Sequence, residues 1–294
     1  MSDSPREVAL LTNPTAGRGQ GARAGAAALQ RLRAAGLSVR SLIGRDSDES
    51  LDLARQAVAD GADTLVVCGG DGMVNIGIQA VATTPTPLGI IAAGTGNDIA
   101  RYFDLPRKDP LAGAQRVIDG NPRTIDLVRV GGHRFFATVM AAGFDAVVNE
   151  RANRMTWPKG QMRYNLATLA ELRTFQPLSY TLDLDGRSMN LDAMLVAVGN
   201  GPSFGGGLRI AEGAKLDDGL LDVVIIKPMG KVELVRTYPK LFRGTHVTHR
   251  QYEHHLARIV TVAAPGIVGY ADGERFGPLP LTMECVPGAL RVLS

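Results

Sequence analysis

Residues 64–75, TLVVCGGDGMVN, decide the fold of the first half of the chain. The apolar run LVVC is continuous, as is typical of a strand buried on both faces of a sheet, and a pair of glycines ends it. On either side, apolar runs at 8–11 (VALL) and 37–42 (LSVRSL) alternate with helical patterns at 23–35 and 51–59. This alternation predicts βαβ units, with helices covering a parallel sheet.

From about residue 123 the pattern changes to short strand candidates joined at GG and DG dipeptides, such as IDLVRV-GG-HRFF. These are hairpin signals, so this half is predicted to form an antiparallel sandwich or barrel. Two helical stretches, Gln161–Arg173 and Lys231–Phe242, interrupt it. We expect an α/β domain over residues 1–126 and an all-β, sandwich-like domain over residues 127–294. An alternative is that the C-terminal segment of the chain returns to the first domain.

Composition sets the class of protein. The 294 residues suit two domains, and 45% hydrophobic with 21% charged residues exclude a disordered or coiled-coil chain. No apolar run is long enough to span a bilayer and no secretory signal is evident, so we expect a cytoplasmic protein. A net charge of +3 suits phosphate or anionic lipid without requiring nucleic acid, which we do not expect as a partner. Cys68 and Cys285, among apolar neighbours, are interpreted as buried thiols.

Three glycine-rich segments each follow a strand candidate and precede a helix candidate: NPTAGRGQG (13–21), GGDGMVN (69–75) and AAGTGND (92–98). Glycines after a strand let backbone N–H groups approach phosphate oxygens, and the next helix offers its positive N-terminus. Singly, each segment is more often a tight turn. Together they predict one anion cradle at the carboxyl edge of the sheet.

Asp71 lies between two glycines of the middle segment. An acid among phosphate-binding amides requires a cation to offset repulsion, and Mg²⁺ bridging to nucleotide phosphates would supply it. The alternative is an Asx-turn or a helix cap. Neither a Walker loop nor a dinucleotide fingerprint is present, so the segments indicate a different class of phosphate site.

Six blocks, in order along almost the whole chain, resemble the bacterial diacylglycerol kinase family. The blocks are NPTAG, GGDGMVN, LGIIAAGTGNDIAR, AAGFDA, GNGPSFGGGLRIAEGAKLDDGLLDV and DGERFGPLPLTMECVPGALRVL. The resemblance implies a fold shared with NAD kinases, in which an α/β nucleotide domain precedes a β-sandwich. It also implies ATP as donor, a lipid hydroxyl such as that of diacylglycerol as acceptor, and Mg²⁺ as helper.

The resemblance also implies site residues, with Asp71 central and Glu274 as the acceptor of the hydroxyl proton. The residues that would hold the nucleotide are Asn13, Pro14, Thr15, Ala16, Gly17, Gly70, Asp71, Gly72, Met73, Val74, Asn75, Ile76 and Thr95. A structural Mg²⁺ loop would use Lys215, Asp218 and Leu220, and the supporting acids would be Asp98, Asp126 and Asp272. The alternatives are a DG turn with a solvated acid at 272–274, a hairpin turn at 215–220, a helix cap at Asp98, and a strand-end acid at Asp126.

Two positions depart from the family pattern. Met73 and Ile76 stand where the family usually carries Thr and Glu, which removes a hydroxyl and a charge near the nucleotide. A lost neutral hydrogen bond costs about 1 kcal/mol, so nucleotide affinity or preference would change. Because Asp71, Thr95 and Glu274 are retained, we expect an active kinase.

A membrane-contact segment is expected at 151–165, RANRMTWPKGQMRYN, since it mixes cations with aromatic residues. Its candidate contacts are Arg151, Arg154, Trp157, Lys159, Arg163 and Tyr164. The alternative is a solvated basic loop with one core Trp. The protein would then visit the inner face of the membrane transiently, as a monomer or a homodimer. The tract HVTHRQYEHH (246–255) is interpreted as a polar, partly exposed turn rather than a metal site.

Other functions remain open on sequence alone. The acceptor could be phosphatidylglycerol, a sphingoid base or a glycolipid precursor. NAD kinases share GGDG-type loops, but the blocks GFDA, LDDGLLD and PGALRVL favour the lipid enzymes. A noncatalytic lipid or nucleotide sensor is the alternative from another class, in which Met73 and Ile76 would mark lost turnover.

Overall fold

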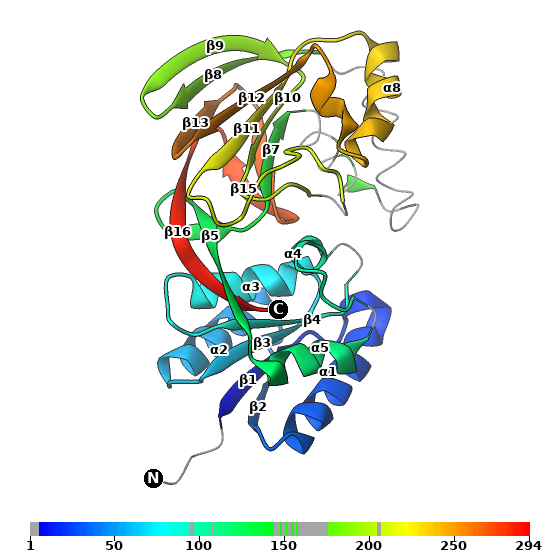
Figure 1. Ribbon diagram of the computed structural model, residues 1–294, viewed down its shortest axis with the longest axis vertical. Coiled ribbons are helices and arrows are strands. Elements are labelled where there is room, and N and C mark those ends of the chain that lie inside the picture. The colour runs from blue at the N-terminus through cyan, green and yellow to red at the C-terminus, as the bar shows by residue number, and fades with distance from the viewer. Residues whose placement is uncertain are drawn as a thin grey trace. The chain divides into compact units, whose positions relative to one another are not determined.

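The computed structural model in Figure 1 divides into two units. It describes residues 6–94, 97–107, 109–143, 176–204 and 207–294, together with Val148, Arg151, Arg154, Met155 and Trp157. Unit 1 comprises residues 1–127 and 286–294, and unit 2 comprises residues 128–285. Among the described residues, no helix is both long and apolar enough to cross a membrane.

Unit 1 is built on a parallel sheet, as predicted. Its strands lie in the order β2 (Ser38–Leu42), β1 (Glu7–Thr12), β3 (Thr64–Gly69) and β4 (Leu88–Ala92). Every residue of β3 and β4 is buried, which explains their unbroken apolar sequences. The last strand, β16 (Leu281–Leu293), pairs parallel with β4 through Val292, so the end of the chain returns to the first unit.

Helices cover this sheet. They are α1 (Ala16–Ala34), α2 (Ser47–Ala59), α3 (Asp71–Val81), the short α4 (Asp98–Tyr102) and α5 (Pro110–Asp119). In Figure 1, α1 packs with α5, and α2 packs with α3. The core beneath α1 and α5 contains Leu10 and Leu32, both almost fully buried.

Helix α1 begins seven residues before the predicted Arg23. The segment AGRGQG was predicted to belong to the first glycine-rich phosphate loop, and glycine also weakens an isolated helix. In the structure, glycine is required where α1 crosses the end of β1: a Cβ on Gly21 would lie 2.1 Å from Asn13 O, and one on Gly25 would lie 2.5 Å from Thr12 Cγ2. Close packing therefore overrides low helix propensity here.

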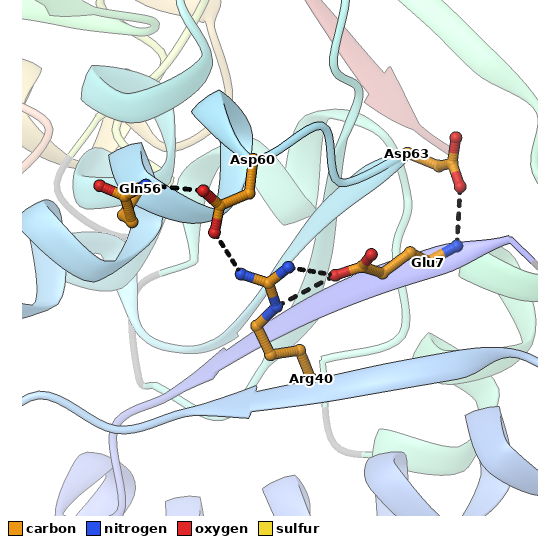
Figure 2. A network of polar contacts seen from close by, with 5 residues as sticks. All are labelled: Glu7, Arg40, Gln56, Asp60 and Asp63. Carbon is orange, nitrogen blue, oxygen red and sulfur yellow. Dashed lines mark hydrogen bonds and ion pairs between the residues drawn. The ribbon is translucent and has the colours of Figure 1, made fainter.

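A polar network joins β1, β2 and α2 at the surface of unit 1 (Figure 2). The Arg40 guanidinium on β2 donates to Glu7 Oε1 at 2.6 Å and to Asp60 Oδ2 at 2.6 Å. Gln56 donates to the other Asp60 oxygen, and Glu7 N donates to Asp63 Oδ2 at 2.7 Å. The hydrogen bonds from Arg40 and Gln56 lower the pKa of Asp60. The network holds the end of α2 against the edge of the sheet.

Unit 2 contains two antiparallel layers. One sheet has the order β12 (Tyr252–Ala257), β11 (Leu221–Ile226), β10 (Leu195–Gly199), β7 (Val139–Gly143), β14 (Val268–Ala271) and β15 (Glu274–Pro278). The other layer pairs β8 (Leu178–Leu184) with β9 (Arg187–Ala193) and β13 (Ile259–Ala263), and β13 with the first part of β16. Its hairpin of β5 (Pro122–Val130) and β6 (Arg134–Phe136) also joins β16. The core that these layers share includes the fully buried Tyr180 and Phe136. The expected antiparallel domain is thus present.

Unit 2 contains the predicted hairpin turns and one of the two predicted helices. The GG and DG dipeptides do form hairpin turns, with Gly131, Gly132, Asp185 and Gly186 all at positive φ. Helix α8 (Lys231–Leu241) matches the predicted stretch, whereas Gln161–Arg173 lies outside the described residues.

The tract at 246–255 is a partly exposed turn, as predicted, only as far as residue 251, and the rest of it is a strand. It runs from the short helix η1 (Thr245–Thr248), which buries His246, into β12. Because β12 is an edge strand, many of its side chains are polar and only partly buried, and this composition resembles that of a turn. Both cysteines are free and buried, as predicted, and burial raises the pKa of Cys68 to about 11.

Candidate active site

The three glycine-rich loops of unit 1 lie side by side. They follow β1, β3 and β4, which are neighbours in the parallel sheet, so their carboxyl ends share one edge. Asn13 N donates to Cys68 O at 3.0 Å, and Ala93 N donates to Gly69 O at 2.7 Å. These backbone hydrogen bonds place the predicted phosphate loops next to one another.

Glycine is required where the loops touch. A Cβ on Gly17, which has φ +57°, would lie 2.4 Å from Ala93 O. One on Gly94 would lie 2.4 Å from Gly70 Cα. No side chain fits at either contact without moving backbone, so these glycines set how closely the loops approach.

Asp71 connects the second loop to the third. It is the first residue of α3, and Gly70 is the cap, so the helix-cap interpretation of Asp71 is wrong. Its Oδ2 accepts a hydrogen bond from Asn97 N at 2.8 Å. Asn97 has a left-handed backbone, and its Nδ2 donates to Gly94 O at 2.9 Å. Sequence reasoning missed Asn97, although its place within GTGND marks it as part of the third loop.

The other predicted nucleotide residues lie in or beside these loops. Asn13 Oδ1 accepts from Thr15 N at 3.0 Å and from Thr15 Oγ1 at 2.8 Å, which closes the first loop. The side chain of Met73 is buried, and Gly69 has no room for a Cβ beside it. Asn75 is also buried, and its Nδ2 has no hydrogen-bond partner in the part of the chain that the structure describes. Thr95 and the side chain of Asp98 lie outside the described residues, although α4 begins at Asp98 with Asn97 as its cap.

Glu274 begins β15, directly after a hairpin turn in unit 2. The turn consists of Asp272 (φ +52°) and Gly273 (φ +83°), and the Glu274 side chain is exposed. The sequence therefore holds this carboxylate at the tip of a short hairpin, where it is accessible to a substrate.

Asp272 is not a solvated turn acid. One carboxylate oxygen accepts from Ala137 N at 2.8 Å, and the other accepts from Thr138 N at 3.1 Å and from Thr138 Oγ1. The fully buried Asn200 supports the same segment, since its Nδ2 donates to Ala137 O at 3.0 Å. These contacts fix the Glu274 hairpin to β7. Thr138 and Asn200 were missed, because only the fold brings them to the DGE turn.

Asp126 is buried on β5, and its Oδ1 accepts from Gly288 N at 2.8 Å. Both residues belong to unit 1, so the contact joins β5 to the returning end of β16. The carboxylate thus has a structural partner within unit 1.

Two family models match the chain. The diacylglycerol kinase catalytic domain matches residues 7–130, and the YegS C-terminal NAD kinase beta sandwich-like domain matches residues 138–294. The chain is also 45% identical over 292 residues to the diacylglycerol kinase of Mycobacterium tuberculosis strain H37Rv, covering 98% of this chain and 94% of that protein. The chain belongs to the diacylglycerol kinase family.

More distant relatives agree with this assignment. The diacylglycerol kinase of Bacillus subtilis is 28% identical over 279 residues, which is 94% of this chain and 92% of that one. A crystal structure from Bacillus anthracis superimposes with a TM-score of 0.81 at 22% identity, covering 98% of this chain and 97% of that one. A crystal structure of a diacylglycerol kinase from the same organism gives a TM-score of 0.75 at 20% identity, with 98% and 96% covered. These two structures share the fold of this chain, and the family models with the curated relatives show that the chain is a lipid kinase.

The predicted Mg²⁺ loop of this kinase lies between Lys215 and Leu220. Asp218 is exposed, and its Oδ1 accepts from Leu220 N at 3.1 Å across Gly219, which has φ +75°. One carboxylate and two backbone carbonyls are all-oxygen donors, which suit Mg²⁺. The described residues contain no cluster of three or more acidic, His or Cys side chains that could hold a metal. The turn at Asp218 and Gly219 is compatible with both interpretations, the Mg²⁺ loop and the plain hairpin turn.

A carboxylate–imidazole pair lies next along the chain. Asp222 on β11 is buried, and its Oδ1 lies 2.7 Å from His254 Nε2 on β12. Burial raises the pKa of Asp222, and the hydrogen bond from His254 partly offsets that shift. Sequence reasoning missed this pair, because the two residues meet only through strand pairing.

An apolar pocket lies between α8 and the β12-β11-β10-β7 sheet of this kinase. Alternate residues of β10 and β11 point to opposite faces, so Val196 and Val223 enter the main core while Leu195 and Ile226 face the pocket. From α8, the lining residues are Leu234, Thr237, Tyr238 and Leu241. From loops and other strands, they include Phe204, Leu208, Ile210 and Tyr252. Figure 1 shows α8 outside the strands of this sheet.

Few polar groups line this pocket. His246 is 1% exposed, its Nε2 lies 3.0 Å from Ile210 O, and its ring contacts Tyr252 edge to face. Burial lowers the pKa of His246, although the Ile210 carbonyl and Glu212 act in the opposite direction. His249 Nε2 pairs with Glu233 Oε1 at 3.3 Å. The pocket therefore suits an apolar ligand with one neutral imidazole beside it.

Three of the six candidate membrane contacts can be placed. Arg151, Arg154 and Trp157 are exposed, and Trp157 is 76% exposed, so it is not the core residue of the alternative interpretation. Lys159, Arg163 and Tyr164 lie outside the described residues.

Proposed function

We propose that this kinase transfers the γ-phosphate of ATP to the hydroxyl of diacylglycerol and forms phosphatidic acid. The observation that carries the proposal is the apolar pocket beneath α8, in a chain whose family acts as lipid kinases. Ligand pockets of this type bury an apolar body and orient it with few polar groups. An acyl chain of the acceptor would occupy it.

In the proposed reaction, the acceptor hydroxyl attacks the γ-phosphorus while Glu274 takes its proton. A new bond forms between the hydroxyl oxygen and phosphorus, the bond from phosphorus to the β-phosphate oxygen breaks, and ADP leaves. Glu274 suits this role because its carboxylate is exposed on a hairpin held by Asp272, Thr138 and Asn200. Little covalent help is needed, since phosphoryl transfer depends on positioning and electrostatics.

The three loops of unit 1 would hold the nucleotide. Backbone amides at the start of α1 and α3 would donate to phosphate oxygens, where the helix dipoles favour negative charge. The buried amides of Asn75 and Asn97 each carry a polar atom without a partner in the described chain, and such atoms in proteins normally find one. Asp71 would complete the site by fixing the third loop.

Mg²⁺ would be held in two places on this proposal. Asp71 would hold the ion that accompanies the nucleotide, and Asp98, Asp126 and Asp272 would be supporting acids. Asp218, with the carbonyls of Lys215 and Leu220, would hold a structural ion. Bound Mg²⁺ supplies positive charge that offsets repulsion between carboxylates and phosphates.

The acceptor of such a kinase resides in a bilayer, so the enzyme must touch one. Arg151, Arg154 and Trp157 would contribute to that contact at the inner face of the membrane, together with Lys159, Arg163 and Tyr164. The exposed indole of Trp157 supports this, because Trp prefers the membrane–water interface.

A panel of lipid acceptors tests the proposed function. Purified protein, Mg²⁺ and radiolabelled ATP or GTP are incubated with diacylglycerol, phosphatidylglycerol, a sphingoid base and a glycolipid precursor in mixed micelles, and NAD is included as a competitor. We expect phosphatidic acid as the main product, with ATP preferred. Faster labelling of another lipid would replace diacylglycerol as the acceptor, and absence of product in a single turnover would favour a noncatalytic sensor.

A further inference from the structure

Helix α8 carries large apolar side chains both in the pocket and on its exposed surface. Leu234, Tyr238 and Leu241 line the pocket. On the exposed surface, here called the outer side, Val232 is 66% exposed and Val235 is 51% exposed. Phe242, directly after the helix, is 47% exposed, and its ring contacts that of Tyr238 edge to face. A surface helix usually has a single apolar stripe that faces its core. Three large apolar side chains on the outer side therefore indicate that a second partner covers this surface.

The outer side of α8 also carries cations. Lys231, Arg236, Lys240 and Arg243 are all exposed. Among the residues that the structure describes, Arg236, Lys240 and Arg243 make no ion pair. The single acid of the helix, Glu233, pairs with His249 and with Arg250 at 3.5 Å. The outer surface thus combines apolar side chains with a positive charge that no acid of the helix offsets.

We propose that this outer surface of α8, from Lys231 to Arg243, docks on an anionic lipid bilayer. Helices that lie in a membrane interface have this composition, with apolar side chains at the acyl boundary and Lys or Arg at the headgroups. The inference rests on the proposed function, because the acceptor comes from a bilayer. The pocket on the inner side of the same helix would receive an acyl chain close to where the helix meets the lipid.

Charge distinguishes a bilayer from a second copy of the chain. In a symmetric dimer the same surface faces itself, so Arg236, Lys240 and Arg243 would meet like charges. Such juxtaposition opposes association, whereas anionic headgroups attract all three cations. The surface is therefore complementary to anionic lipid and not to itself.

Vesicle sedimentation tests the proposal. The full-length protein is mixed with phosphatidylcholine vesicles that contain or lack phosphatidylglycerol, and the bound fraction is measured. One variant combines Arg236→Ser, Lys240→Ser and Arg243→Ser, and a second combines Val235→Ser with Phe242→Ser. The matched control, Arg55→Ser with Arg116→Ser and Arg187→Ser, removes three exposed cations elsewhere.

We expect the wild type to bind anionic vesicles and the control to bind equally well. Each cation near such a surface strengthens binding roughly fivefold, so the triple variant on α8 should bind about 100-fold more weakly. The Val235 and Phe242 variant should also bind more weakly, and circular dichroism checks that each variant is folded. Binding of the α8 triple variant at the wild-type level would overturn the proposal. The proposal would also be overturned if the α8 triple variant differed from the wild type in molecular mass in solution but not in vesicle binding. That result would mean that a second copy of the chain covers this surface.

A soluble acceptor separates this inference from the proposed function. Phosphorylation of monomeric dihexanoylglycerol requires no bilayer, so the α8 triple variant should retain that activity and lose activity on vesicle-borne diacylglycerol. Failure of the wild type to phosphorylate either acceptor would refute the proposed function, whereas vesicle binding by itself would still report on α8. Equal loss on both acceptors would contradict a role for this surface in docking.

Discussion

At Gly94, the backbones of the second and third phosphate loops lie too close together for a side chain. A Cβ there would lie 2.4 Å from Gly70 Cα and 2.9 Å from Asn97 Oδ1. The Gly94→Ala variant should separate these loops and weaken ATP binding on the order of tenfold, or about 1.4 kcal/mol. Titration calorimetry measures this. Gly230→Ala is the matched control, because a Cβ at Gly230 meets no atom within 4 Å, and unchanged affinity in Gly94→Ala would contradict the loop assignment.

Asp272 acts on Glu274 through the hairpin in our account. Asp272→Ala removes the acceptor of the Ala137 and Thr138 amides, so the carboxylate of Glu274 should lose its fixed position. We expect kcat to fall roughly tenfold or more, since small misplacements of catalytic groups are costly, while the KM for ATP stays constant.

Asp185 supplies the control for this variant. It occupies the first position of another DG turn, at φ +51°, and accepts from the amides of Arg258 and Ile259. Asp185→Ala should therefore lower the thermal midpoint to a similar degree without lowering kcat. An Asp272→Ala enzyme with the wild-type kcat would show that the hairpin does not position Glu274.

At the scale of elements, the burial of His246 on η1 makes the stability of unit 2 depend on pH. The pKa of His246 is lowered from 6.5, chiefly by burial, and the groups that oppose this shift are the Ile210 carbonyl and Glu212. The unfolded chain therefore binds this proton more tightly, so the stability that neutral His246 contributes is present above about pH 6.5 and lost as the pH falls through the folded pKa. Urea denaturation at pH 5.5 and 7.5 should show a lower midpoint in acid. His246→Gln should reduce that difference, and an unchanged difference would contradict this role.

The pocket between α8 and the sheet should set which acceptor chains are accepted. Leu234→Phe places a larger side chain in that space. We expect kcat/KM for dioleoylglycerol to fall severalfold more than for dihexanoylglycerol, with the KM for ATP unchanged, because a filled pocket excludes the longer chain. Leu29→Phe is the control, because Leu29 is a partly buried leucine of unit 1 that does not line the pocket. An equal effect on both acceptors would mean that the acyl chain lies elsewhere.

For the whole molecule, sequence patterns predicted the architecture well where their cause is local. Continuous apolar strands such as β3 and the DG turn at Asp185 follow from burial and from backbone preference. Features that depend on distant segments were not predictable. The glycine-rich start of α1, the polar edge strand β12 and the partners of Asp272 are each determined by packing against residues far away in sequence.

The candidate site was predictable to a similar extent. The three loops stand out in the sequence because glycines follow apolar runs in single short segments. Glu274 was singled out only by the resemblance to the kinase family, since the spacing at 272–274 by itself favoured a plain DG turn. The apolar pocket was not foreseen, because its lining residues are scattered between Val148 and Tyr252 on separate strands, loops and α8. Likewise, nothing in the pattern of α8 alone distinguishes the side that faces the pocket from the side that faces solvent.

The central claim is that a nucleotide held by the loops of unit 1 reacts with a lipid hydroxyl whose proton Glu274 accepts. The most direct test measures phosphate transfer from radiolabelled ATP to diacylglycerol by Glu274→Gln, alongside ATP affinity and the thermal midpoint. We predict a loss of transfer on the order of 100-fold or more, with ATP affinity and the thermal midpoint unchanged, because a general base contributes at least that much. Transfer at the wild-type rate by Glu274→Gln would contradict the account.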